Sequence, residues 1–143
     1  MKINKDVGFE IWCVSNLIKR RVENFLNQKH NNMTGFQGRI AGYLYHNMDK
    51  EIFQKNLEEA FNIRRSTVAE VLKTMEKNGF IERRNVDYDA RLKKIILTEK
   101  SIELHNAFLE DIKEIEKIIK KGISDEELEV FFSVLEKIKD NIK

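Results

Sequence analysis

The stretch that decides the fold runs from Arg64 to Arg84 and reads RRSTVAEVLKTMEKNGFIERR. Four of its apolar residues recur at the i, i+3, i+4 and i+7 spacing of one helix face. They are Val68, Val71, Leu72 and Met75. The other face is polar and partly basic, and Gly79 is expected to end the helix because glycine adopts positive φ readily. Such a helix suits the DNA major groove, although a solvated surface helix has the same pattern.

The residues on both sides of this helix extend the interpretation. A shorter helix is predicted to end at about Phe61, with Asn62 and Ile63 as the turn between the two helices. After Gly79, two partly β-branched runs, 80–86 and 92–97, predict strands, with residues 87–91 as the polar tip between them. Two short helices joined by a tight turn and followed by a basic hairpin are the components of a winged helix-turn-helix.

Long helices are predicted at both ends of the chain. On the N-terminal side, one covers Val7 to about Gln28 and is apolar over more than half its circumference. A helix of this kind must be covered from two sides, and a second copy of the chain would do that. A polar turn at 29–33 follows, and Thr34 is expected to cap a helix that reaches about Asn47.

On the C-terminal side, a helix is predicted from about Thr98 to Gly122, and a second one follows Ser124. Ser124 and Glu127 have the spacing of a capping box, in which each side chain bonds the backbone of the other. The apolar residues of the last helix step by three and four, as in a coiled-coil seam. They are Leu128, Phe131, Leu135, Ile138 and Ile142.

Composition and charge limit the function. With 41% hydrophobic and 35% charged residues, the 143-residue chain is typical of a single ordered globular domain. The formal net charge is only +2, but it is unevenly spread. Residues 64–94 contain nine basic and five acidic side chains, and residues 99–143 contain eight basic and twelve acidic ones. This segregation favours a polyanion bound at one end of the molecule.

Other classes of protein are not indicated. Cys13 is the only cysteine, so no disulfide can form within the chain, and we expect a cytoplasmic protein. No apolar run reaches the ~18–20 residues of a membrane span, and we find no export signal. Histidines are scattered and no glycine-rich phosphate loop occurs, so we expect no metal, no cofactor and no enzymatic activity.

With these elements in order, the chain resembles the MarR family of winged helix-turn-helix transcriptional regulators over nearly its whole length. The segment Asp89-Ala-Arg91-Leu-Lys-Lys-Ile-Ile-Leu97-Thr98 is similar to the family's wing signature, an Asp, any residue, an Arg, five residues and Leu-Thr. Arg64–Val68, with Leu72, Met75–Gly79 and Ile81, resembles the family's recognition helix and the strand after it.

The resemblance implies a mainly α (α+β) fold in a single MarR-type domain, residues 1–143. Residues 34–98 would form the winged helix-turn-helix DNA-binding lobe, and residues 1–33 and 99–143 a helical dimerisation region. The implied function is sequence-specific binding of double-stranded DNA by a homodimer, more often a repressor than an activator. The homodimer would bind a palindromic operator and be released by a small aromatic or anionic effector.

The same resemblance, with the chemistry of the side chains, predicts the DNA contacts. Arg91 would enter the minor groove while Asp89 holds its guanidinium in a fork. Arg65 would contact a base edge, and the lysines of the helix would contact the DNA backbone. The predicted DNA-binding residues are Arg64, Arg65, Ser66, Thr67, Lys73, Lys77, Asp89, Arg91 and Lys93.

Two departures from the family pattern leave local questions open. Arg64 occupies the position where a Ser or Asp cap is expected, and Asn62 could cap instead, which would start the helix two residues earlier. Ser101 stands where the family often has glycine, and we expect this change to affect only a helix start.

Cys13, the aromatic residues and the winged-helix module itself each have a second interpretation. Cys13 is placed like the peroxide-sensing cysteine of the OhrR branch of the family, but Trp12 and Val14 beside it favour an inert, packed thiol. Trp12, Phe36 and Tyr43 are candidates for an effector pocket, and plain core packing explains each of them equally well. A winged-helix module used for protein contacts is the third alternative, and the basic wing argues against it.

Overall fold

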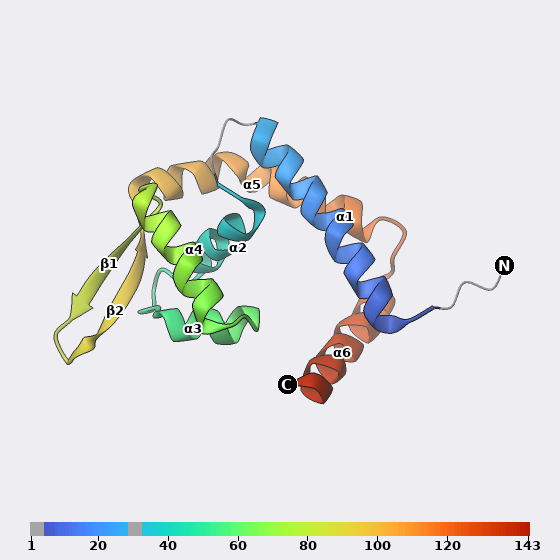
Figure 1. Ribbon diagram of the computed structural model, residues 1–143. Coiled ribbons are helices and arrows are strands. Elements are labelled where there is room, and N and C mark those ends of the chain that lie inside the picture. Colours follow the sequence, from blue (N-terminus) through green and yellow to red (C-terminus); the bar gives the residue numbers. More distant parts are fainter. Residues whose placement is uncertain (1–4, 29–32) are drawn as a thin grey trace. The chain divides into compact units, whose positions relative to one another are not determined.

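The structure, a computed structural model, describes residues 5–28 and 33–143, so the predicted turn at 29–33 lies almost wholly outside the described residues. It is mainly helical with one antiparallel hairpin (Figure 1). The contacts of the chain divide it into two compact units, Met1–Leu109 and Glu110–Lys143. The elements are α1 (Val7–Gln28), α2 (Gly35–His46), α3 (Gln54–Phe61), α4 (Arg65–Lys77), β1 (Ile81–Val86), β2 (Asp89–Leu97), α5 (Glu99–Lys120) and α6 (Asp125–Ile142).

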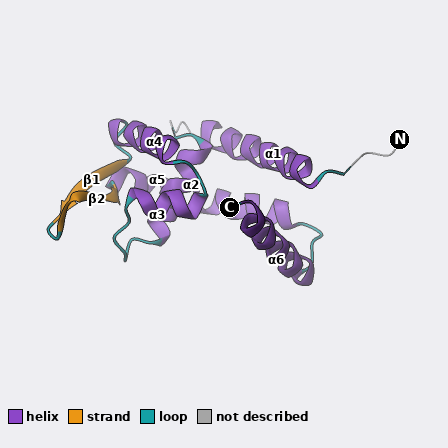
Figure 2. Ribbon diagram, turned by 60° about the horizontal axis from the view of Figure 1, so that its bottom comes forward, coloured by secondary structure: helices purple, strands orange, loops and turns teal. Residues whose placement is uncertain are grey.

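The core of the first unit is built around α4. Val68, Leu72 and Met75 are fully buried, which confirms the apolar stripe predicted for this helix. They pack with Leu57 of α3 and with residues of α2, β1 and β2. Figure 2 shows the hairpin beside α3 and α4. Burying this stripe leaves the polar face of α4 outward, which is the arrangement that a groove-binding helix needs.

Local signals set several of the helix ends. Thr34 caps α2 and forms a capping box with Gln37, and Ser124 forms the predicted capping box with Glu127 at the start of α6. Gly79 has φ 77° just after α4, as expected for the residue that ends this helix.

The start of α4 corrects one alternative. Asn62 does not cap this helix, because it is the C-terminal cap of α3, in the left-handed conformation with φ 53° and ψ 47°. Asparagine tolerates that conformation better than most residues. Helix α4 begins at Arg65, and Arg64 occupies the cap position without a side-chain hydrogen bond.

The hairpin differs from the prediction at its tip. Val86 pairs with Asp89, so the turn contains only Asp87 and Tyr88, and β2 begins three residues earlier than expected. The next pair joins Asn85 to Lys93, which leaves residues 90–92 between the two pairs as an irregularity of the ladder. Arg91 therefore lies within β2, three residues past the turn, and not in the tip.

Helix α5 is fastened to the end of α4 by two hydroxyl groups. Thr98 Oγ1 donates to the carbonyl oxygen of Gly79 at 2.7 Å, and the buried Ser101 Oγ donates to that of Phe80 at 2.5 Å. The sequence predicted that Ser101, in place of the family's frequent glycine, affects only a helix start. The structure gives this serine a second role. It joins α5 to the turn that ends α4.

Candidate nucleic-acid interface

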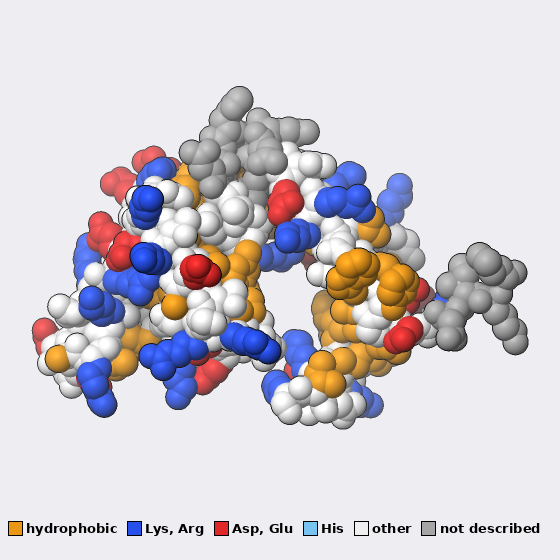
Figure 3. Space-filling view, viewed as in Figure 1, with side chains coloured by type: hydrophobic (Ala, Val, Ile, Leu, Met, Phe, Trp, Pro, Cys, Tyr) orange, Lys and Arg blue, Asp and Glu red, His pale blue; other side chains and the backbone are white. Residues whose placement is uncertain are grey.

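The predicted contact residues of α4 lie on its exposed surface. Arg64 precedes the helix, and its first turn carries Arg65, Ser66 and Thr67, all exposed. Lys73 and Lys77 are exposed further along. In Figure 3 the blue Lys and Arg side chains are spread over the part of the molecule that carries α3, α4 and the hairpin. The N-terminus of a helix also attracts phosphate through its free N–H groups and its dipole.

Arg91 is presented to solvent by its neighbour Asp89. The guanidinium donates to both carboxylate oxygens, at 3.2 Å from Nε and 3.1 Å from Nη2, and the backbone N–H of Arg91 donates to Oδ1 at 2.9 Å. These contacts confirm the predicted fork. The hydrogen bonds from Arg91 hold the pKa of Asp89 below its usual value, so the carboxylate stays ionised. Asp89 thus fixes the orientation of the Arg91 side chain, which stays 89% exposed to solvent.

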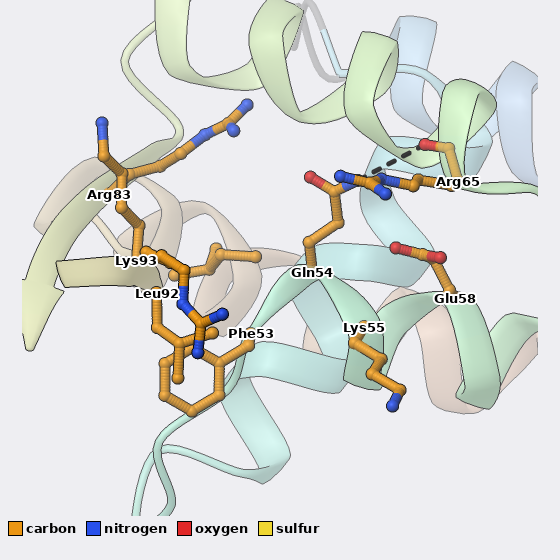
Figure 4. Close-up of a pocket in the computed structure, with 10 residues that line it drawn as sticks. Phe53, Gln54, Lys55, Glu58, Arg65, Arg83, Leu92 and Lys93 are labelled. Atoms are coloured by element: carbon orange, nitrogen blue, oxygen red, sulfur yellow. Dashed lines mark hydrogen bonds between the residues drawn. The ribbon is translucent and has the colours of Figure 1, made fainter. Parts of the chain in front are cut away.

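Between α4 and the wing lies a groove of about 490 Å³. In Figure 4, Arg65, Gln54 and Glu58 reach it from the two helices, and Arg83 and Lys93 reach it from the hairpin. Of the predicted residues, the groove brings together Arg65, Arg91 and Lys93. The other predicted α4 residues are not part of its lining. Its full lining is Phe53, Gln54, Lys55, Glu58, Arg65, Arg83, Arg91, Leu92, Lys93 and Ile95.

Four polar residues of the groove were missed from the sequence: Gln54, Lys55, Glu58 and Arg83. Gln54 Nε2 donates to the backbone oxygen of Arg65 at 3.4 Å, drawn as the dashed line in Figure 4. Successive strand residues point to opposite faces, so one of the two neighbouring arginines, 83 and 84, had to face the groove. That alternation was the available signal, but it does not say which of the two arginines faces inward.

The structure separates these two arginines clearly. Arg83 lines the groove, and its Nε lies 3.8 Å from a carboxylate oxygen of Glu76 on α4. This Nε is buried and has no hydrogen-bond partner among the described residues. Arg84 instead pairs with Glu82 at 2.8 Å and does not line the groove. An arginine that is only loosely paired is available to a phosphate.

The candidate effector residues do not form one cluster. Phe36 and Tyr43 both make edge contacts with Phe61, with ring centroids 5.8 Å apart in each case. Trp12 is 63% exposed and stacks on Phe9 of the same helix. None of the ring contacts found among residues 5–28 and 33–143 joins Trp12 to the other two. An effector pocket at these residues stays a prediction.

Cys13 is the candidate redox residue, and His, Cys, Asp and Glu side chains are the candidate metal ligands. Cys13 is partly exposed on α1, and its redox role stays a prediction that Cys13→Ser tests by comparing DNA affinity with and without peroxide. Within the described part of the chain, no group of three His, Cys, Asp or Glu side chains could hold a metal ion. No described helix has the length and hydrophobicity needed to cross a bilayer.

Comparison with known proteins identifies this arrangement. Residues 46–93, which cover α3, α4 and most of the hairpin, match the model of the MarR family. The chain carries a MarR-family domain. A curated relative, the uncharacterized HTH-type transcriptional regulator YybA of Bacillus subtilis, is 26% identical over 92 residues. The match covers 64% of this chain and 61% of YybA, less than two-thirds of that relative's length.

Solved MarR-family structures match over nearly the whole chain. The transcription regulator MarR of Oenococcus oeni is 28% identical with a TM-score of 0.82, and the match covers 94% of this chain and 99% of that protein. S. aureus MepR in its complex with DNA is 27% identical with a TM-score of 0.86, covering 97% and 100%. The predicted fold, mainly helical with a two-stranded wing, is confirmed by these structures.

Proposed function

We propose that this MarR-family regulator is a sequence-specific repressor that binds a palindromic operator in double-stranded DNA as a homodimer. The observation that carries the proposal is the groove, where Arg65 of α4 and Arg91 and Lys93 of the wing line one basic concavity. A helix and a hairpin set side by side can bind adjacent grooves of the duplex.

The chemistry of each side favours a different part of the DNA. Arg65, in the first turn of α4, can donate two hydrogen bonds to a guanine edge in the major groove. Ser66 and Thr67 suit phosphates, and Lys73 and Lys77 suit the backbone. Arg91, held by Asp89, suits a narrow minor groove, where the electrostatic potential is most negative.

The dimer is supported by apolar surface that a single chain leaves exposed. On α1 this surface contains Phe9, Trp12 and Leu17, and on α6 it contains Phe131 and Phe132, all more than half exposed. Patches of this kind usually mark an interaction site. We propose that a second copy covers them, with residues 1–33 and 99–143 as the dimerisation region and 34–98 as the DNA-binding lobe.

Release by a small aromatic or anionic effector is the further element of the proposal. An effector acts by binding more tightly to the form of the dimer whose two α4 helices no longer match half-sites about one helical turn apart. Titrating salicylate, an aromatic anion, into the protein–DNA complex tests this step. A fall in DNA affinity is expected, and it should be accompanied by saturable binding to the free protein.

DNA binding itself is tested by fluorescence anisotropy on a duplex selected by the wild-type protein from a random-sequence pool. Replacing Arg91 with Ala should weaken binding roughly tenfold and lower the slope of log affinity against log salt by about one or less. Lys139→Ala is the matched control, since it removes the same charge from α6. Equal affinities for Arg91→Ala and wild type would contradict the wing assignment, and no salt-sensitive binding by wild type would contradict the function.

A further inference from the structure

The hairpin that carries Arg91 is not well fixed by its own two strands. Isolated two-stranded hairpins are marginally stable in water. Here the residues around Arg91 are also the irregular part of the ladder, because residues 90–92 lie between the pairs Asn85–Lys93 and Val86–Asp89. The backbone that carries the guanidinium therefore gains little order from β1, and other contacts must set its position.

The connector between α2 and α3 supplies such contacts on the other side of β2. The carbonyl oxygen of Ile52 accepts from the N–H of Ile95 at 2.7 Å, near the base of the hairpin. Phe53 lines the groove together with Leu92, and Figure 4 shows both side chains on the hairpin side of it. One backbone bond near the base orders the strand there, but it leaves the far end of the hairpin free to swing.

A second contact reaches the turn itself. The hydroxyl of Tyr88, in the two-residue turn, donates to Oε2 of Glu51 at 3.0 Å. Because the acceptor is an ionisable carboxylate, this bond is stronger than one between neutral groups. Glu51 and Ile52 are adjacent, yet their partners are seven positions apart on the hairpin, so the connector holds the hairpin at both its turn and its base.

From the geometry we infer that Tyr88 and Glu51 are positioning residues, which hold the wing so that Arg91 is presented at a fixed place beside the groove. Tyr88 is followed directly by Asp89, whose carboxylate accepts from the guanidinium and from the N–H of Arg91. The contacts thus run without a break from the connector to the guanidinium. The inference rests on the proposed function, because a fixed guanidinium matters only if the wing binds DNA.

The first part of the test needs no DNA. Tyr88→Phe removes the hydroxyl and keeps the ring, and Glu51→Gln keeps a carbonyl acceptor in place. Hydrogen exchange of the peptide covering residues 88–93, measured by mass spectrometry on the free protein, should be roughly three- to tenfold faster in Tyr88→Phe. The exchange rate of the same peptide in Glu51→Gln should stay closer to that of wild type, because the amide oxygen can still accept from Tyr88. Unchanged exchange in Tyr88→Phe would overturn the inference.

The second part asks whether Tyr88 acts through Arg91. Tyr88→Phe should weaken binding to the selected duplex roughly three- to tenfold in the wild-type background, and by less than about twofold in the Arg91→Ala background. An equal loss in both backgrounds means that Tyr88 acts on DNA independently of Arg91, which overturns its positioning role. If the wild-type protein binds no duplex, the proposed function fails, and the exchange result alone decides whether the connector holds the wing.

Discussion

The proposed DNA-binding lobe, residues 34–98, buries its apolar residues within one chain, whereas helix α6 leaves its apolar residues exposed. In the lobe, Ile40, Leu57 and Leu72 are all fully buried within one chain. Helix α6 has no buried residue, and Phe131 and Phe132 are 52% and 54% exposed. Both regions nevertheless begin a helix with a complete capping box. Capping therefore sets where a helix begins, but it does not determine what covers the apolar face of that helix.

This comparison predicts that the stability of the two regions depends differently on protein concentration. The free energy of unfolding of the lobe should not depend on protein concentration, since its core comes from one chain. The apolar face of α6 should be covered only when a second copy binds, so its contribution should depend on concentration. Substitutions in one region at a time test this difference, and the most disruptive one comes first.

The largest effect is expected in the lobe. Leu72→Ala removes a fully buried side chain from the centre of the core and should lower the free energy of unfolding by about 3–4 kcal/mol. Val71→Ala, on the half-buried edge of the same helix, is the matched control and should cost about 1 kcal/mol. Urea denaturation at two protein concentrations measures both changes. Equal losses for the two variants would mean that the core is not centred on Leu72.

The next effect concerns α6. Phe131→Glu places a charge on the predicted seam and should raise the dimer dissociation constant at least about 100-fold, because a covered carboxylate loses its hydration. Ser133→Glu adds the same charge on the side of α6 away from that seam and should leave the dimer intact. Analytical ultracentrifugation distinguishes the two variants. A dimer that tolerates Phe131→Glu as well as Ser133→Glu would not use this seam.

A smaller effect is expected at the groove. Arg83→Ala removes a cation that lines the groove and should weaken DNA binding roughly three- to tenfold. Arg84→Ala, one residue later on the other face of β1, loses the same charge and should change affinity by less than about twofold. Anisotropy titrations at matched salt concentration compare them. The groove assignment is wrong if Arg84→Ala proves the more damaging change.

The smallest effect is a pH dependence where α2 meets α5. His105 is buried against Tyr45, with its Nε2 lacking a hydrogen-bond partner among the described residues. Burial lowers the pKa of His105, and the nearby His46 lowers it further. The unfolded chain therefore takes up a proton first as the pH falls below about 6.5, and the folded state loses stability from there down to the lowered pKa.

Thermal denaturation of wild type and His105→Phe measures this effect. Phenylalanine keeps a ring against Tyr45 but cannot be protonated. Between about pH 7.5 and 5.5 the melting temperature of wild type should fall more than that of the variant, because other groups titrate alike in both. Parallel curves for the two proteins would show that His105 takes no part.

Regular local patterns made most of the fold predictable. The spacing of Val68, Leu72 and Met75 located α4 and its buried face, and the hydroxyls of Thr34 and Ser124 located two helix starts. These signals act within a few residues, so they can be read from the chain directly. The wing signature likewise predicted the contact between Asp89 and Arg91, because the two residues are only two positions apart.

One error came from a local pair that strand propensity disfavours, and the others came from contacts between residues distant in sequence. The start of β2 depends on Asp89 pairing with Val86, although Asp and Ala have low strand propensity. Gln54 and Lys55 reach the groove only because α3 packs beside α4 and the wing. Ser101 gave no sign that its hydroxyl bonds Phe80, 21 residues earlier. The groove residues and the Ser101 contact require the tertiary structure to be known first.

Two hydroxyl groups attach the start of α5 to the residues that follow α4, so a rotation of α5 is transmitted to α4. With 22 residues, α5 is about 33 Å long. A swing of about 10° at one end carries the other through roughly 6 Å, which exceeds the ~3.4 Å rise per base pair along the DNA axis. Under the proposed function, a slight tilt of this helix would therefore put α4 out of step with the bases, with no change in α4 itself.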